Sequence, residues 1–222
     1  MIESATGLIL RTRPLTETSL IVHWLTRDSG RIATVAKGAR RPKSPFVGKL
    51  DMFYLADFSF SRSRRSSLHT LRELALRETY PILRQDLSRL RKAAYAAAFV
   101  ETATEPETPL TAIYDLMRIF LAQLQSGPAP HIIFVFDLKM LQELGLEPDL
   151  ENASNLTPGA KKIMQTLTQA DWPDTLRLRL SRAQFAEIKR FLDAHLLYHL
   201  GRVPKSRSAA VATDETDIRD KT

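Results

Sequence analysis

The sequence predicts an α+β protein in which a small N-terminal β-barrel is followed by an all-α helical domain. Apolar and polar residues alternate with a period of two in several short segments of the first 80 residues, as half-buried strands require. After Tyr80-Pro81 the period lengthens to about 3.6 residues, which is the period of an α-helix. A chain of 222 residues also exceeds the roughly 100 to 150 residues of a typical domain, which favours two domains.

Five short strands are expected in the N-terminal region, over residues 7–12, 20–25, 32–36, 52–60 and 68–77. Between the second and third strands, Thr26–Gly30 has the composition of a hairpin turn, in which Gly30 can take a positive φ. In the fourth strand, the alternation assigns one set of residues to the core, namely Met52, Tyr54, Ala56, Phe58 and Phe60. Five short antiparallel strands favour an oligonucleotide-binding (OB) fold, with an SH3-like barrel as the alternative.

Helices are expected from residue 81 to about residue 202. The first has an apolar stripe that includes Leu83 and Leu87, and the second follows the N-cap and N1 pair Thr108-Pro109. The third, over residues 129–144, is apolar on every side and is therefore expected at the centre of the domain. The last opens with a capping box at residues 181–184 and ends at Gly201.

These patterns place an OB-fold domain at residues 1–80 and a helical domain at residues 81–202. Beyond these domains, residues 203–222 contain few apolar side chains, and we expect a disordered tail. Lys205 and Arg207 lie at the start of this tail, and whether they contribute to binding stays open at this point.

The net charge of +7 is confined to the N-terminal region. Residues 1–80 contain fourteen Lys or Arg and seven Asp or Glu, whereas residues 81–222 contain eighteen of each kind. Such asymmetry indicates a polyanionic partner for the barrel, and nucleic acid or an anionic membrane surface are the candidates. The helical domain is charge-balanced and lacks the basic amphipathic helix that membrane-surface binding requires.

The segment from Arg31 to Lys49 carries six cations and no acidic residue. Gly38, Pro42, Pro45 and Gly48 keep its second part out of regular structure, so that its cations can follow a phosphate backbone. Together with the cations on the first strand and in the turn after the fourth, the predicted DNA-binding residues are Arg11, Arg13, Arg31, Lys37, Arg40, Arg41, Lys43, Lys49, Arg62, Arg64 and Arg65. Phe46 and Trp24 are candidates for base stacking, although aromatic residues of a small barrel more often belong to its core.

Catalytic chemistry finds little support in the sequence. The absence of cysteine excludes disulfides, thiolate nucleophiles and Cys-rich zinc sites. His195 and His199 have the i, i+4 spacing of metal ligands, but leucine follows His195 where a metalloprotease has glutamate. Asp51 and Asp57 are weak candidates for a nuclease metal pair. We therefore expect a binding protein with no catalytic and no metal-ligating residues.

Several segments resemble the RecO family of recombination mediators. The most specific is the block Lys37-Gly38-Ala39-Arg40-Arg41 within residues 35–44. The resemblance extends over nearly the whole chain through residues 7–13, 17–22, 73–80, 141–150 and 198–201. It implies an OB fold, a helical domain and a role in DNA repair by binding single- and double-stranded DNA and annealing complementary strands. An RNA-binding or translation-associated OB-fold factor is the alternative, and a preference for single-stranded RNA would favour it.

The resemblance also implies partners and a cofactor. The implied partners are RecR and the single-stranded-DNA-binding protein, whose C-terminal tail would bind the helical domain, and the implied activity is assistance in RecA loading. Many family members carry a four-cysteine zinc site, but residues 151–159 contain no cysteine, so we expect no cofactor. The N-terminus has no basic and apolar leader, and we expect a cytoplasmic, nucleoid-associated protein without membrane partners.

Overall fold

The computed structural model describes residues 1–127 and 129–219, and these divide into two compact units. The barrel unit comprises Met1–Pro81 and Thr104–Met117. The helical unit comprises Ile82–Ala103 and the chain from Arg118 onward. The first division, after residue 81, lies close to the domain boundary expected from the change in period. The grouping of residues 104–117 with the barrel differs from that expectation, which placed them in the helical domain.

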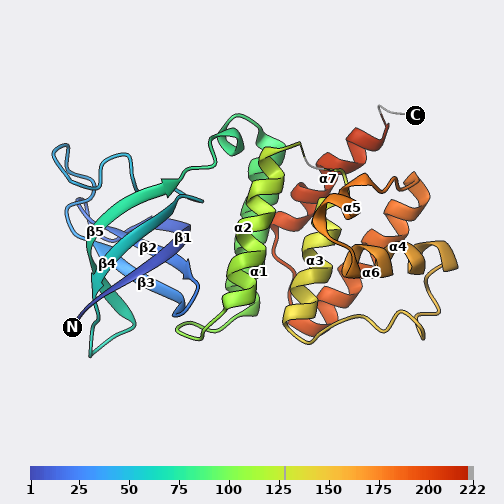
Figure 1. Cartoon of the computed structure of the whole chain (residues 1–222), viewed down its shortest axis with the longest axis horizontal. Coiled ribbons are helices and arrows are strands. Elements are labelled where there is room, and N and C mark those ends of the chain that lie inside the picture. Colours follow the sequence, from blue (N-terminus) through green and yellow to red (C-terminus); the bar gives the residue numbers. More distant parts are fainter. Residues whose placement is uncertain (128, 220–222) are drawn as a thin grey trace. The chain divides into compact units, whose positions relative to one another are not determined.

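The barrel unit is built from five strands, shown in blue to green in Figure 1. Their bounds are β1 (Ile2–Pro14), β2 (Leu20–Thr26), β3 (Gly30–Ala36), β4 (Leu55–Ser61) and β5 (Leu68–Glu78). The strands close into a barrel in the order β1-β2-β3-β5-β4, with β1 pairing β4. β3 and β5 pair in parallel and the other described neighbours in this barrel pair antiparallel. The predicted five-stranded barrel is thus confirmed, and its strand order is that of an OB fold.

Alternation along the strands fills the barrel core. In β3, Ile32, Thr34 and Ala36 are buried, whereas the residues between them are half-buried. The predicted inward set of the fourth strand is correct for Ala56, Phe58 and Phe60. It is wrong at the N-terminal end, because β4 begins only at Leu55 and Phe53, with a φ of 66°, is buried instead of Met52. The positive φ turns the chain into the strand and breaks the alternation there.

Residues 104–107, which the sequence pattern assigns to the helical domain, are hydrogen-bonded to the barrel. The backbone N–H of Glu107 donates to the carbonyl of Arg31 at 2.9 Å, and Pro106 forms a parallel bridge with the same residue. The Arg31 guanidinium donates in turn to Thr104, with an Nε to Oγ1 distance of 2.9 Å. These bonds explain why residues 104–117 belong to the barrel unit, which alternation and helical period alone do not predict.

We expect Gly30→Ala to destabilise the protein more than an ordinary glycine substitution. Gly30 has a φ of 62°, and an added Cβ would lie 1.7 Å from the carbonyl oxygen of Thr108. The left-handed conformation alone costs roughly 1–2 kcal/mol for an alanine. The backbone collision adds to this cost, so that the free energy of unfolding should fall by more than about 2 kcal/mol in urea titrations.

Gly145→Ala is the matched control, because Gly145 has a φ of 66° and an added Cβ there would meet no atom within 4 Å. It should lose only the conformational term of about 1–2 kcal/mol. Equal losses for the two variants would contradict the close packing of residue 108 against the β2–β3 turn.

The helical elements begin with a short 3₁₀ helix, η1 (Pro81–Arg84). The α-helices are α1 (Leu87–Ala103), α2 (Thr111–Gln125), α3 (Ile132–Glu143), α4 (Pro158–Gln169), α5 (Trp172–Arg177), α6 (Arg182–Leu200) and α7 (Ser206–Arg219). Helix α3 is buried almost throughout, and Phe134 and Phe136 pack against the rings of Phe185 and Phe120 at centroid distances of 4.6 and 4.5 Å. The predicted central helix is therefore confirmed. Over residues 1–127 and 129–219, no helix is sufficiently long and apolar to span a bilayer.

Helix ends follow the capping chemistry of the sequence in part. Ser181 and Gln184 form the predicted capping box of α6, and Gly201 ends this helix with a φ of 67°. The second helix, however, begins at Thr111 and not directly after Thr108-Pro109. Pro106 and Glu107 are bonded to Arg31 of the barrel as described above, and the helix begins four residues after Glu107.

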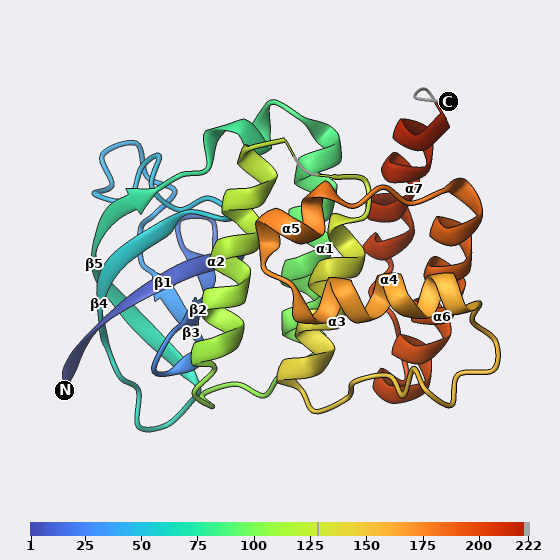
Figure 2. The same ribbon diagram turned by 45° about the vertical axis from the view of Figure 1, so that its right-hand side comes forward.

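The C-terminal segment forms a helix where we expected disorder over residues 203–222. Helix α7 packs against α1 and α6 and is drawn in dark red in Figures 1 and 2. Arg207 is 3% exposed, and Ala210 and Val211 are also buried. Few but well-placed buried side chains thus order a segment whose average composition is polar. Residues 220–222 lie outside the described part of the chain.

Arg207 is the centre of a buried polar cluster in the helical unit. Its guanidinium donates to the carboxylate of Asp137 in α3, to Asp193 Oδ1 in α6 at 2.6 Å and to the Tyr95 hydroxyl in α1 at 3.0 Å. The Tyr95 hydroxyl donates to the other oxygen of Asp137 at 2.5 Å. Burial disfavours the charge on Arg207, but the neighbouring carboxylates outweigh burial and raise its pKa. This cluster joins four helices and withdraws Arg207 from any ligand-binding surface.

Candidate nucleic-acid interface

The loop after β3, residues 37–54, begins with a series of tight turns. Hydrogen bonds between residues three apart follow one another from Arg41 N to Gly38 O, from Ser44 N to Arg41 O and from Val47 N to Ser44 O, at 3.0 to 3.2 Å. The predicted absence of helix or strand over residues 37–49 is confirmed. Four of the predicted DNA-binding cations are exposed on this loop and Lys49 is half-buried; the exposed ones are Lys37, Arg40, Arg41 and Lys43.

Two apolar side chains fix the loop to the barrel. Ala39 and Phe46 are each 7% exposed and belong to the same core cluster as the inward residues of the strands. The backbone N–H of Arg40 also donates to Thr18 O at 2.9 Å, and that of Gly38 donates to Ser19 Oγ at 3.3 Å. Both acceptors lie in the β1–β2 connection. The loop therefore has an ordered backbone from which its cationic side chains extend into solvent.

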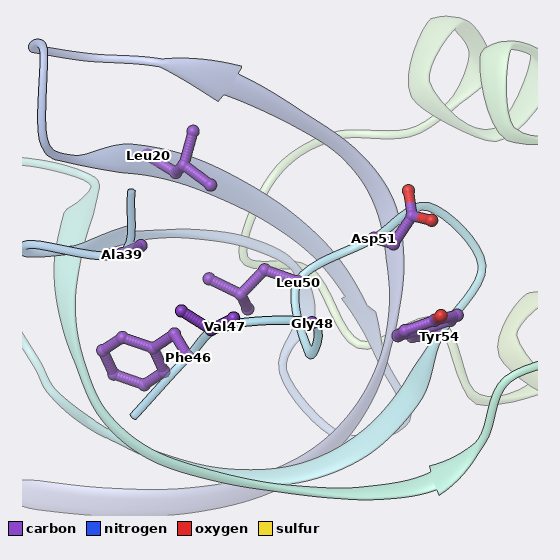
Figure 3. Close-up of a pocket in the computed structure, with 8 residues that line it drawn as sticks. All are labelled: Leu20, Ala39, Phe46, Val47, Gly48, Leu50, Asp51 and Tyr54. Atoms are coloured by element: carbon purple, nitrogen blue, oxygen red, sulfur yellow. The ribbon is translucent and has the colours of Figure 1, made fainter. Parts of the chain in front are cut away.

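A pocket of about 380 Å³ lies between this loop and the barrel (Figure 3). Leu20 of β2 lines it on the strand side, and Phe46 and Val47 line it from the loop. The other lining residues are Ala39, Gly48, Leu50, Asp51 and Tyr54. The lining side chains are apolar except for the Asp51 carboxylate and the Tyr54 phenol, and polar atoms make up nearly half of the lining surface. Sequence reasoning missed it, because its walls come from segments that meet only in the folded barrel.

The register brings Arg11 and Arg13 of β1 to the side of β2. Arg11 is opposite His23, and Arg13 is opposite Ile21. Because Pro14, Leu20 and Ala36 are neighbours across β1, β2 and β3, Arg13 also lies at the end of the barrel from which the cationic loop begins. Arg13 and the loop thus share one end of the barrel, and Arg11 lies two residues further along β1 on the same face.

His23 reports the positive potential of this region, and no pattern in the sequence singles it out. Its imidazole is half-buried, and its Nε2 has no hydrogen-bond partner among the described residues. Burial lowers the pKa of His23 to about 4, with further lowering by the charges of Arg11, Arg13 and Arg31. The charges of three predicted DNA-binding residues therefore lower the pKa of the same histidine and favour its neutral form.

We expect His23 to titrate near pH 4 in an NMR titration of its imidazole carbons. Because its folded-state pKa is depressed below the unfolded value of about 6.5, the unfolded chain binds the proton first. Neutral His23 thus contributes stability that is fully present above about pH 6.5 and is lost as the pH falls towards 4. Arg11→Gln with Arg13→Gln should raise this pKa without restoring 6.5. A wild-type pKa of 6.5 would contradict the buried, cationic environment.

The remaining predicted cations, Arg62, Arg64 and Arg65, lie in the turn after β4. This turn is at the opposite end of β4 from the cationic loop. Arg64 and Arg65 are exposed there. Arg62 is instead held by two carboxylates: its guanidinium contacts Glu3 at 2.7 Å and Glu107 at 3.0 Å, and the bond to Glu3 raises the pKa of Arg62. Since the loop precedes β4 and this turn follows it, the structure separates the predicted residues into two groups. Arg31, whose side chain is bonded to Thr104, belongs to the second group. Its backbone carbonyl accepts from Glu107, and the Glu107 carboxylate contacts Arg62 of that group.

The aromatic candidates for base stacking belong to the core. Trp24 is fully buried, its indole N–H donates to Thr34 Oγ1 at 2.8 Å, and its ring stacks on Phe58 at 4.0 Å between centroids. Phe46 is buried as one of the loop anchors and reaches the surface only through the wall of the pocket. The hypothesis that Trp24 stacks on a nucleobase is therefore wrong, since its ring has no accessible face.

The weaker catalytic candidates have structural partners. Asp57 accepts from Thr6 Oγ1 at 2.6 Å and from Arg77 at 2.5 Å, and these bonds lower its pKa. His195 Nε2 is 2.8 Å from the carbonyl oxygen of Leu146. Among the residues that the structure describes, no three His, Asp or Glu side chains are grouped to hold a metal ion.

The strand order, the ordered cationic loop and the separate helical unit define an OB-fold protein with an appended helical domain. Two family models match this chain: Recombination protein O N terminal over residues 1–80 and Recombination protein O C terminal over residues 84–155. The chain belongs to the recombination protein O (RecO) family, and the resemblance seen in the sequence is confirmed.

Curated relatives support this membership. The chain is similar to the DNA repair protein RecO of Exiguobacterium sibiricum, with 32% identity over 69% of this chain and 61% of that protein. The DNA repair protein RecO of Bacillus subtilis is 33% identical over 68% of this chain and 59% of its own length. The protein of the same name from Symbiobacterium thermophilum is 28% identical over 90% of this chain and 93% of its own length. The first two alignments thus span about three fifths of the relatives' lengths.

Proposed function

We propose that this chain is a DNA repair and recombination mediator that acts by binding DNA and not by catalysing a reaction. Its substrates would be single- and double-stranded DNA, held by the cations of the barrel unit. The observation that carries this proposal is the ordered loop at residues 37–49, whose backbone is bonded to the barrel while four cations stay exposed. Membership of the RecO family, whose members above are named DNA repair proteins, supports the same conclusion.

The proposed mechanism is electrostatic. Cations that neutralise phosphates release condensed counterions and lower the repulsion between two strands, so that complementary strands can approach and pair. This step needs no proton transfer and no bound nucleotide. No arrangement of base-reading side chains on a helix is present in the sequence, and phosphate contacts carry no sequence information directly. Annealing by this surface would therefore be independent of sequence.

The proposed DNA-binding surface has a principal and an accessory part. The principal part comprises the cations of the loop and of the adjoining half of β1, namely Arg11, Arg13, Lys37, Arg40, Arg41, Lys43 and Lys49. Arg64 and Arg65 form the accessory part at the other end of β4. Arg31 and Arg62 contribute less, because Thr104 and the carboxylates of Glu3 and Glu107 already occupy their guanidinium groups.

The proposed partners act with the helical unit and the DNA. We propose that RecR and the single-stranded-DNA-binding protein are the partners, with the tail of the latter on the helical unit, and that together they assist RecA loading. The four-cysteine zinc site of many relatives does not fit this chain, because the sequence has no cysteine. The carboxylate of Asp149 is bonded instead to Asn152 Nδ2 at 2.6 Å in the segment after α3. We propose that the protein acts without a cofactor.

Binding of fluorescent oligonucleotides at several salt concentrations tests this proposal. If about five phosphates are neutralised, the logarithm of the association constant should fall with the logarithm of the salt concentration at a slope of roughly −4 on single strands. DNA should bind at least as well as RNA of equal length and sequence. A slope near zero would contradict the electrostatic surface, and a clear preference for RNA would favour the translation-associated alternative.

A further inference from the structure

The pocket beneath the cationic loop has apolar and aromatic walls together with polar groups, which suits one flat ring with polar edges. Its volume of about 380 Å³ lies at the lower end of the range of about 300–1,000 Å³ found for small-molecule sites. Its floor is continuous with the barrel core, since Leu20, Leu50 and Tyr54 pack against that core while remaining half-buried. On the solvent side, Val47 is 54% exposed. An occupant would bury Val47 and pack against the half-buried ring of Tyr54.

Two cations are direct sequence neighbours of residues that line the pocket. Arg40 follows the lining residue Ala39, and its backbone N–H is bonded to the β1–β2 connection at Thr18. Lys49 lies between the lining residues Gly48 and Leu50. A ligand that places a flat ring in the pocket and anionic groups on either side of it would match this arrangement. A nucleotide within a strand has this chemistry, because a phosphate lies on each side of every base.

We propose that this pocket, lined by residues of the loop and of β2, receives an unpaired nucleobase of the bound strand while the neighbouring cations hold the adjacent phosphates. The inference rests on the proposed function and deepens it. Base contacts with aromatic side chains are tolerant of sequence, because every base has a π-face. Tyr54 and Phe46 supply aromatic walls here.

The pocket distinguishes single from double strands. A base within a duplex is stacked and paired, and entering a pocket requires that it leave the stack at a cost of a few kcal/mol. A base of an unpaired strand loses only its weaker stacking on its neighbours, so its cost of entering the pocket is smaller. The pocket thus adds affinity for the strand before annealing and loses this contribution once the base has paired, which helps the product to leave.

Ala39→Leu tests the pocket in the full-length protein, because it adds side-chain volume to the loop wall of the cavity and removes no cation. For a single strand of about 12 nucleotides, within the site sizes of OB folds, affinity should fall by about 5- to 150-fold, the range of one stacked base. Affinity for a duplex of the same length and for an abasic strand should be unchanged. The salt slope should also stay the same. Ala183→Leu, at an exposed position of α6, is the matched control and should bind all three as the wild type does.

A 2-aminopurine strand gives a second readout, since its fluorescence should be quenched on binding to the wild type and less quenched on binding to the filled variant. Should Ala39→Leu not fold, Val47→Leu narrows the same pocket at an exposed position and should produce the same pattern in smaller degree. Unchanged single-strand affinity in a folded, filled variant would overturn the base pocket and leave the proposed function intact. Absence of any DNA binding by the wild type would overturn both.

Discussion

Replacing Lys37, Arg40, Arg41 and Lys43 together with alanine should weaken DNA binding on the order of a hundredfold at low salt. All four side chains are exposed, and their removal eliminates up to four phosphate contacts. The slope of log affinity against log salt should therefore decrease in magnitude by roughly 3 on single strands. The loop is anchored by Ala39 and Phe46, so the circular dichroism spectrum and melting temperature should stay close to those of the wild type.

A control with the same change in net charge separates this site from a general charge effect. Four exposed cations of the helical unit serve this purpose: Lys162, Arg179, Arg182 and Arg190. Their replacement by alanine should leave both the affinity and the salt slope nearly unchanged. An equal loss in the two quadruple variants would mean that net charge, and not the loop, determines binding.

Arg207→Met should produce the largest loss of stability of the substitutions considered. Removing one partner of a buried ion pair leaves the other charge buried and uncompensated, which costs about 3–5 kcal/mol. Here Asp137 is fully buried, and the variant would leave its carboxylate with the Tyr95 hydroxyl as its remaining partner in this cluster. Urea unfolding monitored by circular dichroism measures the change in the free energy of unfolding.

The double variant Arg207→Met with Asp137→Leu distinguishes charge burial from lost packing. Replacing a buried pair by apolar residues is often neutral or stabilising, so the double variant should be more stable than Arg207→Met alone. Below its own unfolding transition, Arg207→Met should bind DNA with wild-type affinity, because Arg207 is buried in the helical unit. A folded Arg207→Met protein with impaired DNA binding would contradict this placement.

The fold was largely predictable because its signals are local and repeated. Alternation in β3, the apolar run of α3 and the capping box at Ser181 each depend on residues close in sequence. The errors have non-local causes. Residues 104–107 leave the helical pattern because bonds to Arg31 hold them on the barrel. Helix α7 forms because Arg207 binds the buried carboxylate of Asp137 on α3 and the partly exposed carboxylate of Asp193 on α6, which the polar composition of its segment does not reveal.

The candidate site was predictable in its charge and not in its shape. The run from Arg31 to Lys49 identifies the cationic loop without any structure, since like charges in an irregular segment stay exposed. The local environment of each cation depends on pairing across the barrel, which engages Arg62 with Glu3 and leaves Arg64 exposed. The pocket and the shifted pKa of His23 likewise arise only when β1, β2 and the loop are assembled.

Annealing of two complementary fluorescent oligonucleotides, in EDTA and without nucleotide, tests the central claim most directly. We predict that the protein accelerates annealing, that increasing salt suppresses the acceleration and that the quadruple loop variant largely abolishes it. Absence of acceleration by the wild-type protein, or acceleration that requires a metal ion or a nucleotide, would contradict a mediator that acts by binding alone.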